Sequence, residues 1–239
     1  MYGTVTKHER RAGCGERTAM KVIACRVMID EMRGFLPAGV EAVVFEISQH
    51  VHPKQLKAEL QAAIDRLDGS CETILLGYGL CSNAVLGLVS RSARLVLPRI
   101  HDCIGVFLGS HKEYLREMGT EPAFFLTQGY IRGYQSDGSG PMAEFERVAE
   151  RHGTARAERL MGKLMSAYKR LVYIRTDQAL DIEADRAYAH QMAELFHMRY
   201  EERAGTSELL RRMIAGDWNT TDFVVVEPGE AVALEHFWS

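Results

Sequence analysis

Residues 73–103 read TILLGYGLCSNAVLGLVSRSARLVLPRIHDC, and two apolar runs in this stretch each lead into a short polar segment with a cysteine. Such continuous apolar runs are typical of strands that helices cover on both faces. Further runs occur at residues 21–25, 40–47, 123–127, 171–176 and 222–227. Helical patterns separate them at residues 53–67, 104–118, 142–169 and 180–203. This order predicts an α/β fold with an open, mostly parallel sheet and helices on both faces, Rossmann/flavodoxin-like in type.

The domain organisation depends on a Gly-rich polar stretch, GYIRGYQSDGSGP, at residues 129–141. This composition indicates a linker between two lobes or a mobile loop over the site. We expect a single α/β domain over residues 20–239, with a possible second lobe from about residue 142. Residues 1–19 are expected to form a flexible lead-in, because they hold charge but no apolar segment of a secretory signal.

Composition excludes several classes of protein. The 239 residues have a formal net charge of -3, whereas proteins that coat nucleic acid or anionic membranes are usually basic. We therefore expect no nucleic-acid partner and no membrane. The five cysteines are an odd number in a chain long enough to build a core, which argues against a disulfide framework and favours the cytoplasm. Apolar helix faces within residues 142–203 make a homo-oligomer possible.

Three cysteines follow strand ends: Cys25, Cys81 and Cys103. Open α/β sheets bind ligands at the carboxyl ends of their strands, and the order 2-1-3-4-5 would make these three strands neighbours. Each thiol would lie at a helix N-terminus, which favours the thiolate, and three thiolates together require a cation. The sequence therefore predicts a metal site. Cys71, before its strand, and Cys14, in the lead-in, fit ordinary packing instead.

Histidines add further candidates at the same edge. His101 could be a fourth metal ligand, a general acid or base, or an orienting group with Asp102 behind it, and it could equally cap the next helix. His50 and His52, in SQHVHP, follow the second strand and could contact a ligand or substrate.

The third and fourth strand ends offer other binding groups. Gly77 and Gly79 flank Tyr78 in a turn where the backbone must approach something closely, and a cofactor is one such partner. Arg99, like Arg26 after the first strand, could hold an anionic substrate group or pair with a nearby carboxylate. We assign His101, Asp102, Tyr78 and Arg99 to the catalytic set.

The runs IACRVMIDEM, LLGYGLCSNAVLGL, PRIHDCIGVFLGS and FFLTQGY resemble the family called domain of unknown function 1638, over roughly residues 21–173. The family pattern maps onto Cys25, Gly77, Tyr78, Gly79, Cys81, Pro98, Arg99, His101, Asp102 and Cys103. At Tyr130 the family pattern has a Trp. The resemblance implies no established reaction. It does imply an association with corrinoid-dependent methyl transfer in one-carbon metabolism, so a corrinoid protein is a possible partner.

Four mechanisms are open at this point. The first is a small-molecule enzyme, a metal-dependent lyase or transferase, in which the three cysteines hold a [4Fe–4S] cluster with one open iron. The second is zinc held by Cys residues and His101, serving thiol or methyl transfer; the HxC sequence is similar to the zinc-binding segment of corrinoid:thiol methyltransferases. The third is a non-catalytic metallochaperone or corrinoid-protein partner. The fourth is a metal-free cysteine nucleophile with His101 as its base.

Overall fold

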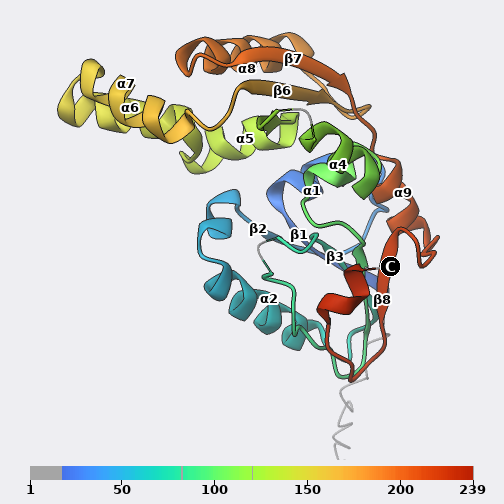
Figure 1. Ribbon diagram of the computed structural model, residues 1–239. Coiled ribbons are helices and arrows are strands. Elements are labelled where there is room, and N and C mark those ends of the chain that lie inside the picture. Colours follow the sequence, from blue (N-terminus) through green and yellow to red (C-terminus); the bar gives the residue numbers. More distant parts are fainter. Residues whose placement is uncertain (1–17, 82, 120, 239) are drawn as a thin grey trace, which may run out of the picture.

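Two β-sheets organise the chain over residues 18–81, 83–119 and 121–238, which the computed structural model describes. The first sheet contains β1 (Thr18–Cys25), β2 (Ala42–Phe45), β3 (Cys71–Gly77), β4 (Arg94–Pro98) and β8 (Phe223–Val226). The second contains β5 (Ala123–Leu126), β6 (Arg170–Arg175) and β7 (Arg199–Ala204). Figure 1 shows the second sheet and its helices stacked above the first.

The first sheet has the strand order β2-β1-β3-β4-β8. β1 pairs in parallel with β2 and β3, and β3 with β4, whereas β8 runs antiparallel to β4. The predicted open, mostly parallel α/β sheet of the Rossmann/flavodoxin-like type is confirmed, and β1, β3 and β4 are neighbours. In the predicted strand order 2-1-3-4-5, the last place was wrong. β8 fills it, because its apolar run FVVV pairs with the equally apolar β4, and the strand at residues 123–126 belongs to the second sheet.

Helices cover both faces of the first sheet, with α1 (Arg26–Met32) and α2 (Pro53–Leu67) on opposite sides of the strands (Figure 1). α2 starts at a proline and buries a stripe of leucine and isoleucine side chains, as its spacing predicts. The remaining helices of this layer are α3 (Ile104–Phe107), α4 (His111–Met118), α9 (Glu208–Ala215) and the short 3-10 helices η1 (Ile47–Val51) and η2 (Leu234–Phe237).

The second sheet is parallel throughout, in the order β5-β6-β7. We call this sheet and its helices the β5–β7 unit; the helices are α5 (Gln128–Asp137), α6 (Gly140–His152), α7 (Thr154–Met165) and α8 (Ile182–Leu195). Leu171, Tyr173 and Met192 are fully buried in a hydrophobic cluster of this unit, separate from the cluster around the first sheet. Residues 208–237 then return to the first sheet.

The stretch predicted as a linker or mobile loop, residues 129–141, is helical. Thr127 caps α5 by accepting a hydrogen bond from the backbone N–H of Tyr130. A side chain at Gly129 would collide with Val27, and one at Gly133 would collide with Ile47. The glycines therefore let α5 pack closely on α1 and η1, and their number does not signal a loop.

Other predicted helices have different limits. The helix predicted over residues 142–169 is divided between α6 and α7 at Gly153, whose φ of 83° a side chain would oppose. The one predicted over residues 104–118 is divided between α3 and α4. The one predicted over residues 180–203 ends at Leu195, and β7 follows it. Sequence patterning missed β7 because it is a charged edge strand whose arginines pair with Glu117, Glu121 and Glu201.

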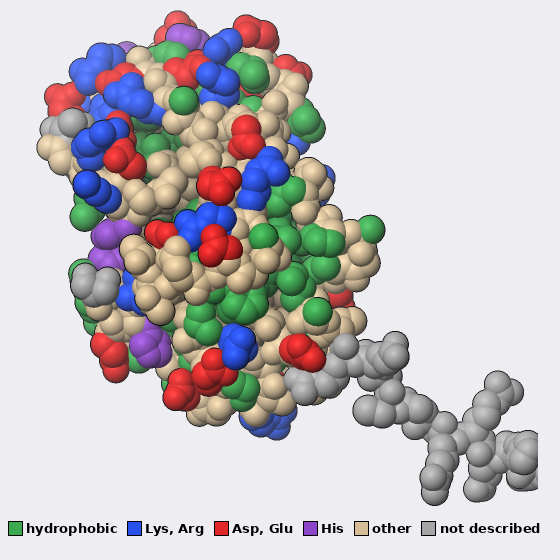
Figure 2. All heavy atoms as spheres, turned by 90° about the vertical axis from the view of Figure 1, so that its right-hand side faces the viewer, with side chains coloured by type: hydrophobic (Ala, Val, Ile, Leu, Met, Phe, Trp, Pro, Cys, Tyr) green, Lys and Arg blue, Asp and Glu red, His purple; other side chains and the backbone are tan. Residues whose placement is uncertain are grey.

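The remaining predictions concern the chain end and the surface. Residues 1–17 of the predicted lead-in, Cys14 among them, lie outside the described residues, and Thr18 already belongs to β1. Over the ranges that are described, no helix has both the length and the apolar character needed to cross a bilayer. On the face shown in Figure 2, acidic and basic side chains lie interspersed, so opposite charges offset each other locally.

Candidate functional site

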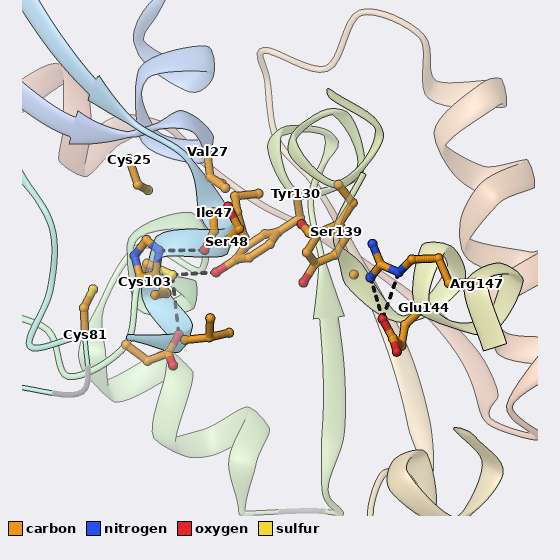
Figure 3. Close-up of a pocket in the computed structure, with 15 residues that line it drawn as sticks. Cys25, Val27, Ile47, Ser48, Cys81, Cys103, Tyr130, Ser139, Glu144 and Arg147 are labelled. Atoms are coloured by element: carbon orange, nitrogen blue, oxygen red, sulfur yellow. Dashed lines mark hydrogen bonds and ion pairs between the residues drawn. The ribbon is translucent and has the colours of Figure 1, made fainter. Parts of the chain in front are cut away.

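The three predicted cysteines line one pocket of about 550 Å³ at the carboxyl ends of β1, β3 and β4 (Figure 3). Cys25 is the last residue of β1, Cys81 follows β3 by four residues, and Cys103 immediately precedes α3. Parallel neighbouring strands deliver their ends to the same edge, which explains the convergence. Cys71 starts β3 and therefore lies at the opposite end of that strand. We call the site the thiol pocket.

The backbone around the thiols differs from the expectation that each would lie at a helix N-terminus. Cys25 and Cys103 do precede helices, although α3 is only four residues long. Cys81 does not, because residues 83–87 form turns. Its φ of 43° is a left-handed conformation that non-glycine residues seldom adopt, and Asn83 shares it at 67°. Such backbone geometry is often found where a side chain is aimed at a functional site.

All three thiols have raised pKa values. Burial raises the pKa of Cys25 to about 11, and the N–H groups of Met28 and Val27 offset this only in part. Burial also raises the pKa of Cys81, where the charge of Cys25 adds to it. The pKa of Cys103 rises through burial and through nearby Asp102 and the other two thiols. The expectation of thiolates is therefore wrong for the thiols alone, which are neutral at pH 7. A bound cation would reverse this balance.

Tyr78, which follows β3 directly, is not among the residues that line the thiol pocket. Its side chain is fully buried, and among the described residues its hydroxyl has no hydrogen-bond partner. Burial raises its pKa, and the charges of Cys25, Cys81 and Cys103 raise it further, so its hydroxyl lies within electrostatic reach of all three. A buried donor without a hydrogen-bond partner is costly.

His50 lines the thiol pocket and stacks on Tyr78 with ring centroids 5.8 Å apart. Its Nδ1 lies 3.1 Å from the carbonyl oxygen of Ile47, so Nδ1 carries the proton and Nε2 keeps a lone pair. Burial lowers the pKa of His50, which favours the neutral ring. His50 can therefore accept a proton or ligate a metal. His52 lines a different, smaller pocket.

The β5–β7 unit closes the thiol pocket from the other side. Tyr130 of α5 places its hydroxyl 2.7 Å from the sulfur of Cys103, and Tyr134 lines the pocket one turn later. Glu144 and Arg147 of α6 form an ion pair at 2.5 Å at this wall (Figure 3). The sequence singled out Tyr130 only as a position of the family pattern. It missed Tyr134 because residues 129–141 were treated as a loop, and it placed Glu144 and Arg147 in a helix without linking them to the site. The i, i+4 spacing of the two tyrosines was the available signal.

Asp102 and His101 point to different places. Asp102 lines the thiol pocket, and its Oδ1 accepts hydrogen bonds from the N–H of Ile104 at 2.9 Å and from the sulfur of Cys103 at 3.7 Å. His101 instead lines a second pocket with Arg99. The structure therefore does not bring His101 or Arg99 together with the three thiols.

The two predicted cofactor-binding glycines face protein atoms. A Cβ at Gly77 would stand 2.7 Å from the Cβ of Ala24, and one at Gly79 would stand 2.8 Å from the carbonyl oxygen of Ile100. The close approach that the sequence predicts is therefore to the neighbouring chain segments. Arg26 pairs with Glu46 at 2.7 Å, which is the carboxylate alternative considered for it.

The thiol pocket contains side chains of the types that bind metals. Within the part of the chain that the structure describes, no three His, Cys, Asp or Glu side chains form a group that could hold a single metal ion as they stand. Three thiols around one pocket nevertheless match in kind the ligands of an iron–sulfur cluster. The chemistry of the residues therefore fits a cluster held by one thiolate from each strand end.

Fold and site together define an α/β protein with a cysteine-lined pocket between a mostly parallel sheet and a second parallel unit. Residues 44–214 match the model of the family described as Protein of unknown function (DUF1638), and the chain belongs to that family. The matched segment contains Cys81, Cys103 and Tyr130, and it begins after Cys25. No curated protein and no solved structure matches the chain.

Proposed function

We propose that Cys25, Cys81 and Cys103 hold a [4Fe–4S] cluster with one iron free of protein ligands, in an enzyme that acts on a small molecule. The observation that carries the proposal is the arrangement of three thiols from three neighbouring strand ends around one pocket. The reaction class that suits this site is that of a metal-dependent lyase or transferase.

A cation would be needed to hold all three cysteines as thiolates. The charge of Cys25 raises the pKa of Cys81, and the charges of Cys25 and Cys81 raise the pKa of Cys103, because ionising two thiols would bring like charges together in a buried place. A metal centre removes this penalty and stabilises all three thiolates. A metal-free nucleophile would use one thiol and give no role to the other two.

An open iron supplies Lewis-acid chemistry when the cluster is bound. The protein's own groups would complete the site. His50 lines the pocket and can accept or return a proton at Nε2. Tyr130 can donate to the sulfur of Cys103 and so adjust the electron density of that ligand.

The pocket supports an enzyme more than a metallochaperone. A metallochaperone needs an exposed metal, whereas Cys25 is buried, Cys81 and Cys103 are only partly exposed, and residues of α5 and α6 form one wall of the pocket. The volume of about 550 Å³ leaves room for a small substrate beside the thiols. We place the protein in the cytoplasm, where thiols stay reduced, and we keep a corrinoid protein as a possible partner.

Zinc is the second candidate, and His50 favours it. A ring whose Nδ1 donates to a backbone carbonyl is the usual state of a metal-ligating histidine. His50 lines the same pocket as the cysteines, so it replaces His101 as the histidine for a zinc site serving thiol or methyl transfer.

The test is anaerobic purification followed by a visible spectrum and by measurement of iron, acid-labile sulfide and zinc. A brown protein with about four iron and four sulfide per chain is expected. Cys81→Ala should abolish metal binding, whereas Cys71→Ala, at the far end of β3, should leave the metal content unchanged. Stoichiometric zinc in a colourless protein would select the second candidate. Equal metal content in the two variants would refute the proposal that the thiol pocket holds the metal.

A further inference from the structure

A second pocket, of about 450 Å³, lies beside the thiol pocket at the end of β4. It is lined by Arg99, His101, His111, Thr221, Phe237 and Trp238. Asp102 and Cys103 belong to the thiol pocket, so the chain segment that follows β4 contributes consecutive residues to two different pockets. We call this second site the His101–His111 pocket.

Three nitrogen atoms of this pocket have unused hydrogen-bonding capacity. Arg99 Nε, His101 Nε2 and His111 Nδ1 are shielded from water, and none has a hydrogen-bond partner among the described residues. Buried polar atoms of folded proteins are nearly always paired, and an exception calls for a physical explanation such as a bound ion. Three exceptions lining one pocket point to one shared partner.

Aromatic contacts hold the two imidazole rings together. The ring centroids of His101 and His111 are 4.0 Å apart, and the indole of Trp238 meets the ring of His101 edge-on at 4.5 Å. His111 also stacks on Tyr114 at 6.1 Å. The rings are therefore positioned by packing, and their unpartnered nitrogens do not result from loose side chains.

The charge of the pocket selects the kind of partner. Arg99 brings a guanidinium cation to the pocket, and a cation beside the two rings opposes a metal ion. His111 is the first residue of the eight-residue helix α4, whose N-terminus adds partial positive charge. No acidic side chain is among the described residues that line the pocket. Arg99 is a fixed donor here, and each neutral imidazole can also donate one N–H.

We propose that the His101–His111 pocket binds a compact oxyanion, the phosphate or carboxylate group of a small molecule, through Arg99, His101 and His111. This assignment does not depend on a metal in the thiol pocket, because it uses other side chains. It also gives the two predicted site residues that the structure separates from the thiols, Arg99 and His101, a shared role.

The test is equilibrium dialysis of the anaerobically purified protein against labelled inorganic phosphate and, separately, labelled acetate. Saturable binding of one anion per chain is expected. Arg99→Gln and His111→Asn should each weaken it about tenfold or more, since each removes a donor to a charged group. Arg94→Gln, at the other end of β4 and 42% exposed, should bind as the wild type does. If phosphate binds more tightly than acetate, the ligand group is a phosphate; if acetate binds more tightly, it is a carboxylate.

A measurement on the unaltered protein covers the case in which a variant fails to fold. Ring C–H resonances of His101 and His111 should shift in NMR spectra as the bound anion is added, while those of His52, which lines another pocket, should not. Absence of saturable binding of both anions would overturn the proposal. Binding that leaves the two rings unaffected, or that a folded Arg99→Gln variant retains at full affinity, would overturn it as well.

Discussion

The hydroxyl of Tyr130 lies 2.7 Å from the sulfur of Cys103. Tyr130 belongs to α5 and Cys103 to the end of β4, so this contact joins the β5–β7 unit to the first sheet inside the thiol pocket. It lowers the pKa of Cys103, although burial raises that pKa by more. The second sheet thus contributes directly to the chemistry of a thiol that the first sheet positions.

Tyr130→Phe should lower the reduction potential of the proposed cluster while leaving its iron and sulfide content unchanged. A hydrogen bond to a ligand sulfur stabilises the reduced, more negative state, and the variant removes it. An EPR-monitored redox titration measures the change. Tyr134→Phe, one turn along α5, is the matched control and should have the wild-type potential. An unchanged potential in Tyr130→Phe would show that the contact does not act on the centre.

Removing the proposed metal centre should lower the melting temperature of the protein by roughly 5–10 °C, because a group that binds only the folded state stabilises it. The measurement compares thermal unfolding of the protein as purified with unfolding after chelation. Cys81→Ala should unfold at one temperature under both conditions. A wild-type melting temperature that chelation does not alter would argue against a metal bound by the folded thiols.

Asp68→Asn should reduce the free energy of unfolding by about 1–2 kcal/mol at pH 7. Burial opposes the charge of Asp68, but hydrogen bonds from Ser90, Arg91 and Ser92 outweigh it and lower the pKa to about 2. A carboxyl whose pKa is lower in the folded state stabilises above its unfolded pKa, and this stability is lost as the pH falls toward 2.

Urea unfolding of the wild type and of Asp68→Asn between pH 7 and pH 3 tests this dependence. The difference between the two should be largest near neutrality and should narrow below about pH 4. Asp65→Asn changes an exposed carboxylate in α2, the helix that Asp68 caps. Its free energy of unfolding should stay close to that of the wild type at every pH. A constant difference at all pH values would mean that the charge of Asp68 is not what stabilises the fold.

Gly133→Ala should destabilise the protein by about 1 kcal/mol, because the added methyl group overlaps Cδ1 of Ile47 and forces that side chain out of its packing against α5. Gly162→Ala should instead stabilise the protein by up to about 1 kcal/mol. Its Cβ would meet nothing within 4 Å, and alanine suits the interior of α7 better than glycine. Urea unfolding of both variants gives the comparison, and equal effects would contradict the packing role of Gly133.

The parallel strands and the convergence of three cysteines followed from local sequence, because apolar runs mark covered strands and parallel strands end at one edge. The role of α5 could not be predicted in the same way. Taken locally, Gly129 and Gly133 indicate a break in a helix. Their presence in α5 is explained only by their close contacts with Val27 and Ile47, which are far away in the sequence.

His101 shows a second limit. Its position two residues before Cys103 suggested a shared site, but alternation of side chains holds only within a regular strand. β4 ends at Pro98, and residues 99–103 bend without regular structure, so neighbouring side chains enter different pockets. Spacing alone could not give their directions, which depend on the packing of Trp238 and His111 around the ring.

The antiparallel strand β8 has a consequence for how the protein is made. β4 is complete after Pro98, but its outer partner is synthesised only when residues 223–226 appear. Until then the ribosome-bound chain has an unprotected apolar edge at Leu95, Val96 and Leu97, a template on which another chain can add a strand. Nascent chains that stop before β8 are therefore expected to aggregate through β4, and release of the last residues ends this exposure.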